Sequence, residues 1–159
     1  MKYLFTLVIA LFSVPAFAQL IQATMMHDGE ERTYDVYLPD NYEPGVEWPL
    51  VFNLHGLVTN TVQQGIYTAF TAVADTANFI ICHPNGTNPI GSGQGWDVEF
   101  PGVPVEVDDV GFIDRLIDTI HTNYNINLGR VYSTGMSNGG YTSYKLARDM
   151  TDRKQATPT

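Results

Sequence analysis

The sequence predicts an α/β fold, built from a mostly parallel sheet with helices on both faces. Two short apolar runs, at 49–54 and 79–82, contain few polar residues, which is typical of strands buried on both faces of a parallel sheet. Segments with a helical spacing of apolar residues lie at 61–78 and 110–124. A β-branched run follows at 131–134. This alternation of strands and helices favours a parallel sheet covered by helices.

Residues 1–18 predict a secretory signal sequence. Lys2 supplies the positive start, residues 3–14 the apolar stretch, and Ala16 to Ala18 a cleavage site with small residues at its ends. The apolar stretch is too short for a typical membrane span. We therefore expect a secreted protein, extracellular or periplasmic, that begins at Gln19 and is not held in the membrane. Residues 19–159 are enough for one domain with a real core.

The composition excludes several functions. A formal net charge of −9 makes nucleic acid and anionic lipid poor partners. Cys82 is the only cysteine, so no intramolecular disulfide can form, and the apolar residues before it predict a buried thiol. The histidines show no metal-ligand spacing, so no metal and no cofactor are expected; they are His27, His55, His83 and His121. Of these, His27 and His121 are expected to be solvated surface residues.

The first half of the chain predicts two strands, a helix and a strand. Residues 32–38 (RTYDVYL) alternate well enough for a first, antiparallel strand. Residues 49–54 (PLVFNL) form the next strand, which stops at His55 and Gly56. The helical spacing at 61–78 predicts one crossover helix, and 79–82 is the following strand. His83 then begins a stretch with turn chemistry, HPNGTNP.

The second half begins with a long loop rich in glycine, proline and asparagine at 85–104. Trp96 in this loop is expected either to line a pocket for an ester or to be an ordinary packing residue. Asp108 is expected to cap the helix that ends near Tyr124, with Asp109 in its first turn, and capping explains this acidic pair better than acid–base catalysis does. A turn at 125–130, a strand and a helix over 142–149 complete the pattern.

The most informative stretch is 131–141, VYSTGMSNGGY. It contains the spacing G-x-S-x-G, with Ser137 between Gly135 and Gly139. Between a strand and a helix, this motif places the serine hydroxyl on a sharp exposed turn, the nucleophile elbow. The alternative is a glycine–serine turn that only caps a helix. Because ligands of parallel sheets lie beyond the carboxyl ends of the strands, Ser137, His55 and His83 are candidates for one site.

The chain resembles α/β-hydrolase esterases of the polyhydroxybutyrate depolymerase group and the related feruloyl and acetylxylan esterases. The resemblance implies hydrolysis of carboxylic esters, of polyhydroxyalkanoates or of plant cell-wall feruloyl or acetyl groups, through an acyl-enzyme on Ser137. It implies oxyanion donors at the backbone of Asn138 and Leu57, with Gly56 allowing close approach. It also places His55 in the oxyanion loop, not as the base. The matching stretches are RTYDVYLP, PLVFNLHG, ADTANFIICHPNGT, VDDVGFIDRLIDTI and INLGRVYSTGMSNGG.

The triad acid and base that the resemblance implies are expected after the nucleophile. No histidine follows Ser137, and the carboxylates after it are Asp149 and Asp152. In a regular helix Asp149 would lie about 18 Å along the axis from Ser137, too far to orient a base. We therefore expect an incomplete catalytic domain that ends after the elbow helix, from a premature stop, a frameshift or a gene fragment.

Two functions from different classes follow. The first is a secreted serine esterase of which this chain carries the nucleophile half and by itself lacks turnover. The second is a non-catalytic remnant with a binding or assembly role. A third possibility within the first class is a dyad in which His55 or His83 replaces the missing base.

Overall fold

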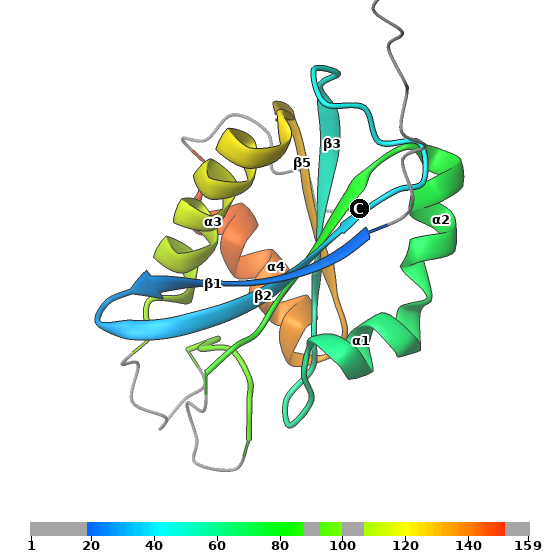
Figure 1. The fold of residues 1–159 in the computed structure, drawn as a ribbon. Helices are drawn as coiled ribbons and strands as arrows, with labels where there is room; N and C mark the ends of the chain where they lie inside the picture. Colours follow the sequence, from blue (N-terminus) through cyan, green and yellow to red (C-terminus); the bar gives the residue numbers. More distant parts are fainter. Residues whose placement is uncertain (1–18, 88–92, 100–106, 152–159) are drawn as a thin grey trace, which may run out of the picture.

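The computed structural model describes residues 19–87, 93–99 and 107–151. The predicted signal sequence and part of the predicted 85–104 loop lie outside these ranges. The strands form one sheet in the order β1-β2-β4-β3-β5 (Figure 1). Their bounds are β1 Gln19–His27, β2 Glu30–Leu38, β3 Trp48–Leu54, β4 Ile80–Pro84 and β5 Ile126–Gly135. The strands β4, β3 and β5 are parallel, whereas β2 is antiparallel to both β1 and β4.

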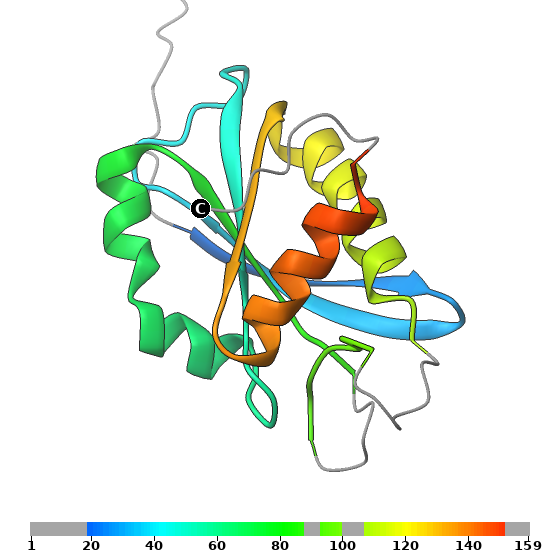
Figure 2. The ribbon, with the colours of Figure 1, turned by 180° about the vertical axis from the view of Figure 1, so that it is seen from behind.

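Helices cover both faces of the sheet, as the sequence predicts. The pair α1 (Thr61–Thr68) and α2 (Phe70–Ala77) packs on one face, and α3 (Asp109–Tyr124) and α4 (Asn138–Asp149) pack on the other (Figures 1 and 2). Alternate residues of each strand therefore enter different layers. Phe52 and Cys82 belong to the large core under α3 and α4, while Tyr37 and Ile81 pack in a smaller cluster with α2. The predicted burial of the Cys82 thiol is confirmed.

The first strand of the sheet, β1, is absent from the sequence prediction. It pairs with β2 over its whole length through the turn at Asp28 and Gly29, both with positive φ (50° and 81°). The prediction that His27 is solvated is wrong, because its side chain is 6% exposed at the end of this hairpin. Its Nε2 is 3.0 Å from the Asp108 carbonyl oxygen, and its ring lies beside Phe112. The hairpin is thereby attached to the start of α3. By contrast, His121 is exposed as expected.

The predicted single helix over 61–78 is in fact two helices. Ala69 has a φ of 49°, a left-handed conformation that ends α1 and starts α2. Asn53 in β3 donates to the Thr68 hydroxyl, which itself donates back to the Gln64 carbonyl in the same helix. Such back-bonding competes with a regular continuation of the helix. The predicted turn over 125–130 is also shorter, since the left-handed residue Asn125 alone separates α3 from β5.

The two acids at the start of α3 have different roles. Asp108 is the predicted N-cap, and its Oδ1 accepts a hydrogen bond of 2.8 Å from the Gly111 amide. Asp109 is buried and accepts from Arg32 at 2.7 Å and from the Asp97 amide at 2.8 Å. Burial raises the pKa of Asp109, and the Arg32 guanidinium opposes this. The ion pair between Arg32 and Asp109 joins β2 to α3 inside the protein.

No helix within the described ranges is sufficiently long and hydrophobic to cross a lipid bilayer.

We predict that Asp109→Ala destabilises the fold far more than Asp108→Ala. The first change leaves the buried Arg32 guanidinium without its carboxylate, which typically costs about 3–5 kcal/mol. The second removes an N-cap, which typically costs about 1 kcal/mol. Urea unfolding of the two variants measures both losses. Equal losses would show that Arg32 does not depend on Asp109.

Candidate active site

The sharp turn between β5 and α4 carries Ser137. Its φ of 52° and ψ of −113° are in a region that side-chain-bearing residues rarely adopt, which costs on the order of 1–3 kcal/mol. The Ser137 side chain is exposed at this turn. The Met136 amide donates to the Leu54 carbonyl at 3.2 Å and so attaches the turn to the end of β3. A Cβ on Gly139 would collide with that same carbonyl, so glycine is required for this approach.

The loop after β3 lies against the turn. A Cβ built on Gly56 would be 3.8 Å from the Cβ of Ser137 and 3.0 Å from Cε of Met136. The next residue, Leu57, and the first residue of α4, Asn138, both lie against Gly95: a Cβ on Gly95 would be 2.6 Å from Leu57 Cδ1 and 3.2 Å from Asn138 Oδ1. No described residue accepts a hydrogen bond from the backbone amide of Leu57 or Asn138.

Trp96 holds the loop and the turn together. Its backbone amide donates to Asn138 Oδ1 at 2.7 Å, and its carbonyl accepts from Asn138 Nδ2 at 3.1 Å. Its indole Nε1 donates to the His55 carbonyl at 2.9 Å. Of the two expectations for Trp96, pocket wall or packing residue, the second describes its place, because the side chain is only 2% exposed.

The Esterase family model matches residues 26–153, which is most of the chain. The chain belongs to the Esterase family. The bifunctional acetylxylan esterase/xylanase XynS20E of Neocallimastix patriciarum is 32% identical over 117 residues, covering 73% of this chain and 16% of the relative. Feruloyl esterase C of Emericella nidulans is 30% identical over 123 residues, covering 73% of this chain and 41% of the relative.

The fold agrees with this membership. The solved structure of an acetyl xylan esterase from Aspergillus awamori superposes with a TM-score of 0.66 at 20% identity, covering 86% of this chain and 49% of that chain. The predicted α/β-hydrolase-type fold and the resemblance to feruloyl and acetylxylan esterases are thus confirmed. The chain spans less than half the length of each of these relatives.

In this member of the Esterase family, His55 has no ring nitrogen free for proton transfer. Its Nε2 accepts a hydrogen bond of 2.9 Å from the Gly86 amide, so Nδ1 carries the proton and donates to the Gly56 carbonyl at 2.7 Å. The side chain is fully buried, and burial lowers its pKa. His55 thereby fixes the loop between β3 and α1, instead of lining a pocket as the sequence suggested.

His83 lies elsewhere. It sits in β4, separated from β5 by β3, and its ring is under α1, where a Cβ on Gly65 would be 4.0 Å from Cε1. It is 4% exposed, and burial lowers its pKa while Asp35 opposes this. The expectation that His83 lines the pocket of Ser137 is therefore wrong. In the described part of the chain, no hydrogen bond joins Ser137 Oγ to a histidine or a carboxylate.

Sequence reasoning named His55, Trp96 and Asn138 but missed the contacts that hold them in place. Gly86 bonds His55, and a Cβ on it would collide with the Gly95 carbonyl, yet its only signal was the turn-forming sequence around it. The backbone bonds of Trp96 to Asn138 leave no trace in sequence spacing, because the partners are 42 residues apart.

We predict that the free energy of unfolding falls as pH is lowered below about 6.5, in part through His55. Its pKa lies below the ordinary value of 6.5 in the folded state, so the unfolded chain binds more protons in this range and stability decreases toward acid. Urea unfolding at a series of pH values measures the slope. His55→Gln should flatten the slope relative to wild type. Identical slopes in wild type and His55→Gln would contradict this origin.

Proposed function

We propose that this chain provides the nucleophile and the oxyanion donors of a serine carboxylic-ester hydrolase. The observation that carries the proposal is the exposed Ser137 in a positive-φ turn directly against the Gly56 loop. The backbone amides of Leu57 and Asn138 have no acceptor among the described residues, and the side chains of both residues lie against Gly95. Membership of the Esterase family indicates that the bond to be hydrolysed is an ester bond.

In the proposed reaction the Ser137 oxygen attacks the ester carbonyl carbon while a general base takes the hydroxyl proton. The amides of Leu57 and Asn138 stabilise the negative charge on the carbonyl oxygen. The alcohol leaves with that proton and the acyl group remains on Ser137. Water then attacks the acyl-enzyme, and the carboxylic acid is released.

The base is neither His55 nor His83 in this proposal. Both ring nitrogens of His55 are bonded to backbone groups, and His83 lies under α1. The dyad alternative therefore receives no support from the geometry. A base and an acid must come from groups other than these two histidines.

We propose plant cell-wall esters, acetyl or feruloyl groups on xylan, as the substrate class. The support is that two relatives bear the names acetylxylan esterase and feruloyl esterase. Polyhydroxyalkanoate esters are the other chemistry that the same nucleophile could attack. A non-catalytic remnant with a binding role is the competing function, and the experiment below separates it from an esterase.

We predict that imidazole added as an external base increases hydrolysis of 4-nitrophenyl acetate by the chain, and that Ser137→Ala abolishes this increase. The reason is that, in this proposal, the described residues provide a nucleophile and donors, while none of them is a base hydrogen-bonded to Ser137. Ser133→Ala is the matched control, because Ser133 is buried in β5 and bonded to Ser143 at 2.8 Å.

The measured quantity is the imidazole-dependent rate above that of imidazole in buffer. A rate that is equal in wild type and Ser137→Ala would support the non-catalytic function and overturn the esterase proposal. Methyl ferulate and a 3-hydroxybutyrate dimer as alternative substrates rank the two ester classes.

We also propose that the protein is exported and processed after Ala18. The support is the pattern of residues 1–18, which has a positive start, an apolar stretch and a cleavage site with small residues at its ends. Expression of residues 1–159 in a bacterium should give a periplasmic protein whose intact mass starts at Gln19. A protein that stays in the cytoplasmic fraction and still starts at Met1 would contradict export and processing.

A further inference from the structure

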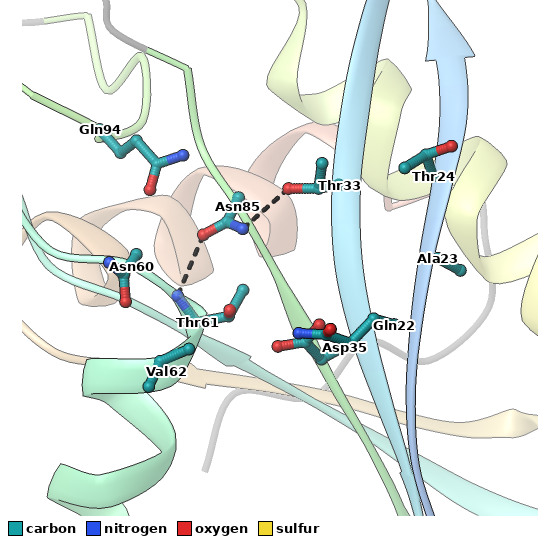
Figure 3. A pocket seen from close by; sticks show the side chains of 10 residues that line it. All are labelled: Gln22, Ala23, Thr24, Thr33, Asp35, Asn60, Thr61, Val62, Asn85 and Gln94. Carbon is teal, nitrogen blue, oxygen red and sulfur yellow. Dashed lines mark hydrogen bonds between the residues drawn. The ribbon is translucent and has the colours of Figure 1, made fainter.

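We propose that a polar groove beside the start of α1 binds an uncharged polysaccharide chain. The groove has a volume of about 470 Å³ and lies between the β1–β2 hairpin and the first turn of α1 (Figure 3). Its lining is rich in amides and hydroxyls and includes Gln22, Thr24, Asp35, Asn60, Asn85 and Gln94. Ser137 is not part of it, so the groove is separate from the candidate active site.

The fold leaves this part of the sheet uncovered. Residues of β1 and β2 that point to the α1 side, such as Thr24 and Asp35, have no helix above them because α1 packs on β3 and β4. Asn85 fixes one wall: its Oδ1 accepts from the Thr61 amide at 3.0 Å, and its Nδ2 donates to Thr33 at 2.8 Å (Figure 3). The groove is therefore formed before any ligand arrives.

Asp35 is the main observation in favour of a ligand in the groove. Its side chain is 7% exposed and lines the groove, yet no described residue donates a hydrogen bond to its carboxylate. The neighbour opposite it in β4, His83, is also buried, and its Nδ1 has no hydrogen-bond partner among the described residues. Because the carboxylate lines the groove and accepts no hydrogen bond from a described residue, it can accept one from a ligand. A ligand hydroxyl would supply the missing donor.

The chemistry of the lining selects a sugar over other ligands. Among the described residues that line the groove, Asp35 alone is charged, so a phosphate or carboxylate ligand would be repelled. A divalent cation usually needs several oxygen ligands of which more than one is charged. Side-chain amides and threonine hydroxyls both donate and accept, which matches the paired hydroxyls of a pyranose ring.

The groove continues toward the loop between β3 and α1, which contains Gly56. A second hollow of about 300 Å³ shares Thr33, Asn85 and Gln94 with it and extends along Gly86 and Thr87. The Gly86 amide bonds His55, and the Gln94 carbonyl accepts from the Val58 amide at 2.7 Å. His55 and Val58 belong to the loop between β3 and α1, which borders Ser137. The inference thus rests on the proposed function for its purpose, which is to hold the glycan that bears the ester.

The test measures binding of xylohexaose to the chain by isothermal titration calorimetry, without any catalytic step. Thr24→Trp should fill the groove and abolish binding, whereas Met26→Trp, on the same face of β1 but outside the groove, should not. Asp35→Ala should weaken binding about tenfold, the loss of one good hydrogen bond to a charged group.

Two further variants and ligands separate the possible failures. Ser137→Ala should bind xylohexaose as wild type does. Xylohexaose binding together with an imidazole-dependent hydrolysis rate that is equal in wild type and Ser137→Ala would overturn the esterase proposal alone. Absence of xylohexaose binding, or binding unchanged by Thr24→Trp and Asp35→Ala, would overturn the groove alone. Because no described residue donates a hydrogen bond to the Asp35 carboxylate, its alanine variant should fold, and far-ultraviolet circular dichroism checks this for all variants.

Discussion

The arrangement of this protein depends on one close approach, between the end of β3 and the turn that follows β5. Ser137 can occupy its positive-φ conformation only because neighbouring contacts hold it there: the Met136 amide is bonded to the Leu54 carbonyl, and Gly139 leaves room for that carbonyl. A strained turn of this kind persists where the surroundings over-determine it. The parallel pairing of β3 with β5 brings the two strand ends together, since Leu54 is in register with Gly135.

A second level of support comes from the segment 93–99, which has no regular secondary structure. Trp96 joins the Gly56 loop to Asn138. The next residue, Asp97, is attached to α3 because its backbone amide donates a hydrogen bond to the Asp109 carboxylate. Asp109 in turn pairs with Arg32 in β2. The buried ion pair thus positions a segment that contacts the elbow, although neither charged group is near Ser137 in the sequence.

The parts of this fold that the sequence predicted are those with a local physical cause. The apolar runs at β3 and β4, the G-x-S-x-G turn and the Asp108 cap each depend on a few adjacent residues. The strand β1 was missed because most of its residues are exposed or half-buried and it has no continuous apolar run. The break at Ala69 follows from a bond between Asn53 and Thr68, which no helical periodicity contains.

The buried histidines show the same limit of prediction from the sequence. His27 and His83 gave no signal of burial, since a histidine is polar and its neighbours in space come from other elements, Asp108 for one and Gly65 for the other. Sequence reasoning could place His55 at a strand end but not decide what its ring does. The Gly86 amide decides it: by donating to Nε2 it makes the imidazole a fixed structural element and removes it from proton transfer.

The hydrogen bond from Gly86 to His55 also connects two regions at one edge of the sheet. On the antiparallel side, β1 and β2 leave a polar surface beside α1; on the parallel side, β3 and β5 present the strained serine. Gly86 and Gln94 belong to the polar side and are bonded to His55 and Val58 of the loop on the other. The Val58 amide donates to the Gln94 carbonyl and the Gly86 amide donates to the His55 side chain, so displacement of the groove wall would shift the loop between β3 and α1. The groove wall and the loop beside Ser137 are therefore mechanically connected.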